Sequence, residues 1–186
     1  MKAIFDYIIS SFLFSLIAVP FVILFRYKNY KKGADFKKEA AIMLFFMSAT
    51  LIFCQTAIPP QFMSGNFTLS AFHSPDFSTY LEFPYIQLGW IKWMLTLKEY
   101  SEIVINIGGN LIIFIPIGFL APYIWKNLKA KAILIGFLLS CFVEFIQLFT
   151  DRTSDYNDII LNTIGTAIGY VLCLIIKKIH NKRASS

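Results

Sequence analysis

Five apolar runs, each close to 20 residues long, limit what this chain can fold into. An α-helix needs about 20 mainly apolar residues to cross the hydrocarbon core of a bilayer. The runs occupy residues 4–25, 40–58, 103–125, 132–150 and 159–176. We therefore predict an all-α, polytopic membrane protein in which five transmembrane helices form one bundle. The length suits a single membrane domain that spans residues 1–186.

The composition agrees with a membrane protein. Hydrophobic residues make up 57% of the chain and charged residues 15%, whereas a soluble domain usually has about 25% charged residues. The cysteines Cys54, Cys141 and Cys173 all lie within apolar runs, so no disulfide framework is predicted. The net charge of +6 does not indicate a nucleic-acid partner, because the basic residues cluster beside the apolar runs, as topology signals do.

Most basic residues fall on one side of the predicted membrane. Of the 17 lysines and arginines, six lie in loop 26–39, three in loop 126–131 and four after residue 176. The positive-inside rule places this side in the cytoplasm and therefore leaves the N-terminus outside the cell membrane. We also expect the basic loop 26–39 to contact anionic lipid.

The long connection 59–102 is expected on the outer side. Its second half, from Phe83 to Leu97, is rich in aromatic and apolar residues but too short and interrupted to span. It is interpreted as an interfacial or re-entrant helix, with Trp90 and Trp93 at the depth of the headgroups. The alternative is a loop that packs over the bundle.

Polar side chains enter the outer halves of three predicted helices. They are Asn106 and Asn110 on the third, Glu144 and Gln147 on the fourth, and Asp155, Asp158 and Asn162 on the fifth. Spacings of three and four residues place each set on one helix face. At 1.5 Å per residue, the polar groups of the third and fourth helices lie roughly 5–10 Å below the outer helix ends. We predict a polar pocket open to the outer face, with Arg152 at its rim as the counter-ion.

Each polar residue has a structural interpretation beside the functional one. Amides in membrane helices often only link helices by hydrogen bonds, which is the favoured role for Asn106 or Gln147 alone. Convergence of Glu144 with Arg152, Asp155 and Asp158 instead favours a site.

The carboxylates Glu144, Asp155 and Asp158 are also the candidate catalytic groups, and they suit a hard cation such as Mg²⁺ or Ca²⁺. They lack a regular ligand spacing, so neither a metal nor another cofactor is predicted.

The same residues resemble the VanZ-like family of bacterial membrane proteins. The matching motifs, all between about residues 103 and 175, are Asn106-x-x-x-Asn110, Phe114-x-Pro116-x-Gly118, Glu144-x-x-Gln147, Arg152-x-x-Asp155-x-x-Asp158 and Asn162-x-x-Gly165-x-x-x-Gly169. The resemblance implies a role at the cell envelope of Gram-positive bacteria. The namesake of the family confers low-level resistance to teicoplanin, a lipid-bearing glycopeptide antibiotic.

Three hypotheses follow for the function. The leading one is a binding protein whose pocket engages a membrane lipid headgroup or an amphiphilic glycopeptide and lowers susceptibility to teicoplanin-like antibiotics. Its ligand-binding residues would be Asn106, Asn110, Glu144, Gln147, Arg152, Asp155, Asp158 and Asn162. The second is a membrane enzyme that modifies a lipid-linked headgroup. The third is a scaffold in which the polar cluster only locks the helices.

Overall fold

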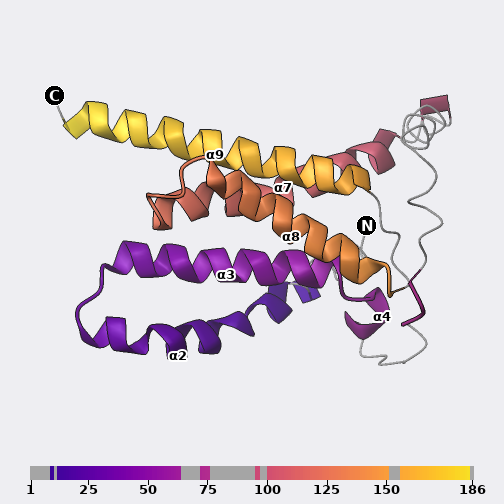
Figure 1. Cartoon of the computed structure of the whole chain (residues 1–186), viewed down its shortest axis with the longest axis horizontal. Helices are drawn as coiled ribbons and strands as arrows, with labels where there is room; N and C mark the ends of the chain where they lie inside the picture. The colour runs from indigo at the N-terminus through magenta and orange to yellow at the C-terminus, as the bar shows by residue number, and fades with distance from the viewer. Residues whose placement is uncertain are drawn as a thin grey trace.

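A computed structural model of the chain (Figure 1) describes residues 9–10, 12–63, 72–75, 95–96, 100–150 and 156–184. Within them, regular structure is helical apart from an isolated antiparallel bridge between Phe72 and Thr150. The helices are α2 (Ala18–Lys31), α3 (Phe36–Thr56), the short α4 (Pro60–Met63), α7 (Tyr100–Ile124), α8 (Lys131–Gln147) and α9 (Tyr156–Ala184). The predicted all-α class is thereby confirmed.

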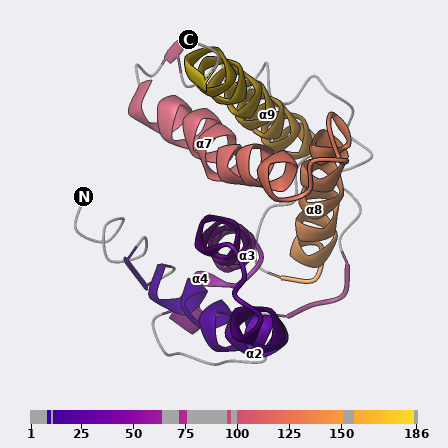
Figure 2. The ribbon, with the colours of Figure 1, turned by 90° about the vertical axis from the view of Figure 1, so that its left-hand side faces the viewer.

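The five long helices pack as a bundle with α2 at one margin. Among the described helices, α2 packs on α3, α3 packs on α7 and α8, and α9 covers α7 and α8. Figure 2 shows the bundle end-on, with α3 between α2 and the group formed by α7, α8 and α9. The last three helices therefore form a compact unit, and they carry all the predicted site residues that the structure describes.

Four helical stretches are long and apolar enough to cross a membrane. They are Phe12–Lys31, Phe36–Thr56, Asn106–Ile124 and Tyr156–Arg183. The fourth predicted span corresponds to α8, which has 17 residues, so the five long helices agree with the five predicted spans. Large apolar side chains on their outer faces are exposed, including Leu138 and Phe145 on α8. Such faces suit contact with lipid rather than water.

The connection between the first two spans is shorter than predicted. We expected a basic loop over residues 26–39, but α2 continues to Lys31 and α3 already begins at Phe36. Asp35 caps α3 by accepting a hydrogen bond from the Lys37 backbone N–H, and Gly33 turns the chain with a φ of 74°, a conformation that glycine adopts without steric cost. The predicted loop was drawn from the positions of the basic residues. These positions do not show that the helix caps confine the turn to residues 32–35.

An ion pair joins α2 to α3 beside this turn. The Arg26 Nε donates to Glu39 Oε2 at 2.9 Å, and a second guanidinium nitrogen donates to Glu39 Oε1. The Glu39 side chain is only 4% exposed. Because an unpaired buried carboxylate would be costly, this two-point contact fixes the two helices against each other.

The core lies where α3, α7 and α8 meet. Its fully buried side chains include Ile52 from α3, Phe114 and Ile117 from α7, and Val143 from α8.

The interfacial helix expected over residues 83–97 lies outside the described residues, except for Leu95 and Thr96, which are helical.

Glycines bring α7 and α9 into backbone contact. A Cβ placed on Gly165 would lie 2.2 Å from the Leu111 carbonyl oxygen, and one on Gly169 would lie 2.1 Å from that of Ile115. Gly165 and Gly169 thus form a small-residue face directed at α7. Gly108 and Gly109, in contrast, have open space around them.

Candidate functional site

A continuous line of polar side chains runs between α7, α8 and α9, and we call it the polar seam. It consists of Asn110 on α7, of Ser140, Glu144 and Gln147 on α8, and of Asp158, Asn162 and Thr166 on α9. On α8 and α9 its members recur every three or four residues, which is the spacing that keeps side chains on one helix face.

In the innermost part of the seam, one hydrogen bond joins α9 to α8 and a second lies within α9. Asn162 Nδ2 donates to Ser140 Oγ at 2.8 Å, and the Thr166 hydroxyl donates to the Asn162 backbone carbonyl at 2.9 Å. All three side chains are 1% exposed or less. Thr166 also fills the space left by Gly118 of α7 and Gly136 of α8, so the three helices converge on this residue.

The middle of the seam holds two carboxylates. Asn110 Nδ2 on α7 donates to Asp158 Oδ1 on α9 at 2.7 Å. Glu144 lies one helical turn, about 6 Å, beyond Ser140, and Asp158 lies one turn before Asn162. Because α8 and α9 are antiparallel (Figure 1) and Ser140 bonds Asn162, Glu144 and Asp158 lie at a similar height. The Glu144 side chain is 2% exposed, which makes its ionised form expensive without nearby compensation.

At the end formed by the last turn of α8, the seam reaches α3. Gln147 Nε2 donates to the backbone carbonyl of Thr56 at 2.7 Å. Thr56 is the last residue of α3, and its carbonyl is free because the final turn of a helix leaves its carbonyls without intrahelical partners. Gln147 thus caps α3 from a neighbouring helix.

Within the part of the chain that the structure describes, three buried polar atoms at the seam and beside it have no hydrogen-bond partner. They are Gln147 Oε1, Asn162 Oδ1 and the Tyr156 hydroxyl. A buried polar atom without a partner costs about 1–3 kcal/mol, and native proteins leave few of them. The Gln147 amide cannot simply be turned over, because its nitrogen donates to a carbonyl, which only accepts. These atoms are consequently places where a ligand group would gain hydrogen bonds.

The predicted site residues fall into three groups. Asn110, Glu144, Gln147, Asp158 and Asn162 lie on the seam. Asn106 lies one turn before Asn110 with an exposed side chain. Arg152 and Asp155, together with the rest of loop 151–155, are outside the described residues, so the predicted counter-ion and the third carboxylate stay predictions.

Sequence reasoning missed several contributors. Ser140 and Thr166 follow the same four-residue spacing as Glu144 and Asn162, and this periodicity was the available signal. The Thr56 carbonyl carried no such signal, because a backbone group is not distinguished by residue type. Among the described residues, no set of three or more His, Cys, Asp or Glu side chains is placed to hold a metal ion.

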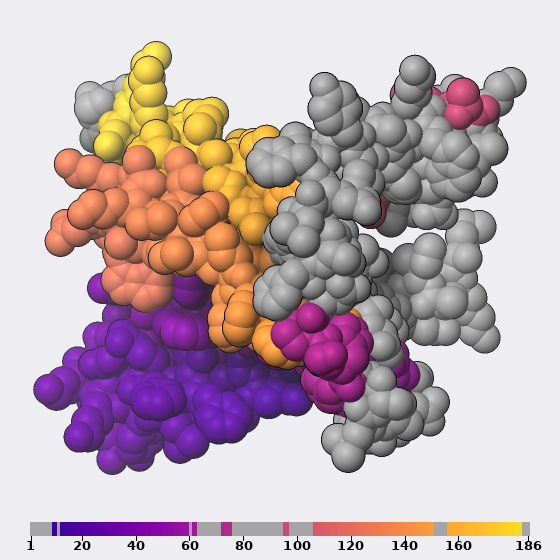
Figure 3. Space-filling model, turned by 45° about the vertical axis from the view of Figure 1, so that its right-hand side comes forward, coloured from indigo at the N-terminus to yellow at the C-terminus, as the bar shows by residue number. Residues whose placement is uncertain are grey.

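A short segment of the connection 59–102 lies against the end of α8. The His73 backbone N–H donates to the Phe149 carbonyl at 3.1 Å, and the ring Nε2 lies 2.7 Å from the Thr150 carbonyl oxygen. Figure 3 shows residues 72–75 packed beside this end of the helix. The connection 59–102 is thus anchored within a few residues of Gln147.

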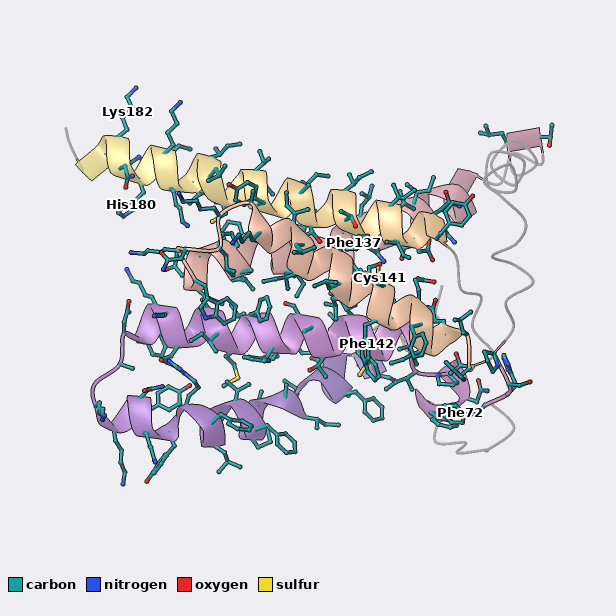
Figure 4. The ribbon with its side chains drawn as sticks, viewed as in Figure 1. Phe72, Phe137, Cys141, Phe142, His180 and Lys182 are labelled. Carbon is teal, nitrogen blue, oxygen red and sulfur yellow. The ribbon has the colours of Figure 1, made fainter. Side chains whose placement is uncertain are left out.

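The two ends of the bundle differ in charge. Figure 4 places His180 and Lys182 at one end of the molecule and Phe72 at the other. The described lysines and arginines belong to the ends of α2 and α9, the start of α3 and the connection 125–130 with Lys131, which meet at the end that carries His180 (Figure 1). The seam residues Glu144 and Gln147, near the end of α8, lie toward the opposite end.

Comparison with known proteins identifies the family. A family model described as VanZ/LLP1 matches residues 45–177, which include α7, α8 and nearly all of the apolar part of α9. No curated protein and no solved structure shows significant similarity to the chain. The matched region contains every residue of the polar seam, and it covers well over half of the sequence. The chain, with its apolar membrane helices, therefore belongs to the VanZ-like family.

Proposed function

We propose that this protein binds the polar head of an envelope amphiphile, a lipid or a lipid-bearing glycopeptide, in the polar seam between α7, α8 and α9. Binding would withdraw such molecules from the membrane surface and lower susceptibility to teicoplanin-like antibiotics. The family resemblance supports the link to teicoplanin and to the envelope of Gram-positive bacteria.

The observation that carries the proposal is the pair of buried amide oxygens without partners, Gln147 Oε1 and Asn162 Oδ1. A seam that only joined helices would be expected to satisfy its own atoms, as the Asn110–Asp158 contact does. The amide nitrogens, which are already bonded, hold these two acceptors in place, so a ligand group that reaches them meets oxygens that are already oriented.

The surroundings of the seam suit the rest of an amphiphile. On α8 the side chains of Leu138 and Phe145, which lie away from the seam, are 56% exposed and apolar. An acyl chain could lie along them while the head enters between the helices. The concentration of cations at the far end of the bundle supports an outward-facing seam, because the positive-inside rule assigns that end to the cytoplasm.

The test is a binding measurement with a fluorescently labelled teicoplanin and the purified full chain in detergent micelles. Replacing Asn162 with Leu removes the acceptor and the bond to Ser140, so affinity should fall by about tenfold or more. The matched control is Thr163→Val, because the Thr163 hydroxyl donates within α9, to the Ile159 carbonyl. Equal affinity of the wild type and Asn162→Leu, with both folded, would contradict a seam-bound head.

A cellular measurement tests the consequence. In a susceptible Gram-positive host, expression of the wild type and of Thr163→Val should raise the teicoplanin concentration needed to stop growth, whereas Asn162→Leu should not. Equal membrane levels of the three proteins are the necessary control. Protection by Asn162→Leu equal to that of the wild type would separate resistance from the seam.

A further inference from the structure

One end of the bundle carries most of the positive charge of the chain, and we call it the cationic end. Segments 26–39, 126–131 and 177–183 hold six, three and four, and thus 13, of the 17 lysines and arginines. Only two of the 11 acidic residues, Asp35 and Glu39, belong to these segments. The three segments meet at the same end of the molecule (Figure 1).

Most of these cations are exposed, and the exceptions hold the surface together. All but Arg26 and Lys177 are exposed. Arg26 is bonded to Glu39, and Lys177 Nζ donates to the Pro122 carbonyl oxygen at 2.8 Å. The second bond holds the tail of α9 beside the end of α7, where the connection to α8 begins. The cations of the tail and of the connection therefore belong to one surface.

One lysine of this surface has an unfavourable backbone conformation. Lys129, in the turn between α7 and α8, has a φ of 45°, which lies in the left-handed region that residues other than glycine rarely adopt. The turn between α2 and α3, at the same end of the bundle, places Gly33 at its positive φ. Glycine would suit position 129 sterically, yet the chain has a lysine there. A cation that contributes to binding accounts for this residue.

Aromatic side chains mark the depth of the cationic end. Tyr27, Tyr30, Tyr123 and Trp125 lie beside the cationic segments in the sequence and are between 39% and 53% exposed. Tyrosine and tryptophan are enriched where a membrane meets water. The neighbouring lysines therefore lie at the level of lipid headgroups, which their long side chains can reach. This position favours a lipid over a soluble polyanion.

We infer that the cationic end is a docking surface for anionic phospholipid headgroups, with Lys129 among the residues that contact them. A lysine offers one positive charge and three N–H donors, and a headgroup phosphate offers negatively charged oxygens that accept. A basic residue close to an anionic membrane surface contributes about 1 kcal/mol, which is a gain of about fivefold in affinity. The surface lies at the opposite end of the bundle from Gln147, so the inference does not depend on the proposed function.

The test is a lipid competition followed by native mass spectrometry of the purified full chain in dodecyl maltoside. Phosphatidylglycerol, which is anionic, and phosphatidylcholine, which has no net charge, compete for the protein with identical acyl chains. Phosphatidylglycerol should bind at least about fivefold more tightly. The preference should decrease as the salt concentration rises, because exposed charges are screened. Equal binding of the two lipids at low salt would overturn the inference.

Variants assign the preference to this end of the bundle. Replacing Lys126, Lys129 and Lys131 together with Gln should lower the preference for phosphatidylglycerol, whereas replacing the same three with Arg keeps the charge and should preserve it. Asn162→Leu, in the polar seam, should also preserve it, which separates this surface from the proposed function. An unchanged preference in the Gln variant, or its loss in Asn162→Leu, would overturn the inference.

Lys129→Gly separates a binding role from a structural one. In micelles without added lipid, its melting temperature should not fall, since glycine adopts a positive φ without steric cost. The increase in melting temperature on adding phosphatidylglycerol should nevertheless be smaller than in the wild type, because one cation has been removed. An increase equal to that of the wild type would refute contact between Lys129 and the headgroup.

Two soluble anions test the identity of the partner. Inorganic phosphate at the concentration of the lipid should not raise the melting temperature, because it lacks the acyl chains that hold a headgroup at the surface. A short oligonucleotide should not displace phosphatidylglycerol in the competition. Displacement by the oligonucleotide, or an equal increase with phosphate, would overturn a lipid as the partner.

Discussion

Replacing Gly169 with Ala tests how closely α7 and α9 must approach. The new Cβ would lie 2.1 Å from the Ile115 carbonyl oxygen and 2.9 Å from the Phe119 nitrogen. Both neighbours are backbone atoms of a helix, so neither can rotate away, and the helices must separate by about 1 Å to restore van der Waals contact. Such overpacking usually costs about 1–3 kcal/mol. The separation would also loosen the Asn110–Asp158 bond that joins the same two helices.

The matched control is Gly109→Ala on α7. A Cβ at this position meets nothing within 4 Å, and Ala favours a helix over Gly by up to about 1 kcal/mol, so the control should be neutral or stabilising. Both variants gain the same helix propensity, and their difference therefore reports the α7–α9 contact alone.

The assay is thermal unfolding of the purified protein in micelles. We expect the melting temperature of Gly169→Ala to be about 4–8 °C below that of Gly109→Ala, from about 2 kcal/mol and about 2–4 °C per kcal/mol for a chain of this length. Gly136→Ala should fall between them, since its Cβ meets the Thr166 side chain rather than backbone. Equal melting temperatures for Gly169→Ala and Gly109→Ala would refute the reasoning.

Three further predictions concern the Arg26–Glu39 ion pair between α2 and α3, the orientation in the membrane, and whether the protein modifies lipids. Arg26→Met should lower the free energy of unfolding by about 1–3 kcal/mol, measured by chemical unfolding, because it leaves the buried Glu39 carboxylate without its partner. The loss should be smaller than for a fully buried pair, since Arg26 is 31% exposed. Adding Glu39→Met should recover part of the loss, and additive effects of the two substitutions would refute the ion pair. In His180→Cys, a membrane-impermeant thiol reagent should label the new cysteine only after cells are opened, because the cationic end is proposed to face the cytoplasm; labelling of intact cells would reverse the orientation. Lipid extracts from cells with and without the protein should contain the same species by mass spectrometry, because binding needs no covalent step; a new headgroup mass would favour the enzyme hypothesis instead.

The helices and the seam could be predicted largely because each rests on a repeating pattern. Apolar runs of about 20 residues have few alternatives to a membrane helix, and the five runs correspond to the five long helices. Three- and four-residue spacings placed Glu144 with Gln147 and Asp158 with Asn162 on single faces. Their convergence followed because polar side chains in a membrane are stable only when they meet one another.

Contacts that depend on which residues meet in the folded bundle could not be predicted from the sequence. Gly109 and Gly169 look alike in the sequence, yet only Gly169 meets another helix, since a glycine contact is decided by the rotation of both helices. The cap that Gln147 provides to α3 depends on a backbone carbonyl. The turn after α2 was misjudged because cations were counted as loop residues, whereas Arg26, Lys28 and Lys31 extend the helix.

The shortness of α8 has a consequence for the lipid around it. Its 17 residues give a helix about 26 Å long, against a hydrocarbon core of about 30 Å. As the fourth predicted span, α8 would therefore require the bilayer beside it to thin so that the helix ends stay covered. The exposed apolar face of α8 would then border a local depression in the membrane, where a headgroup sits nearer to Gln147 than it would in an undisturbed leaflet.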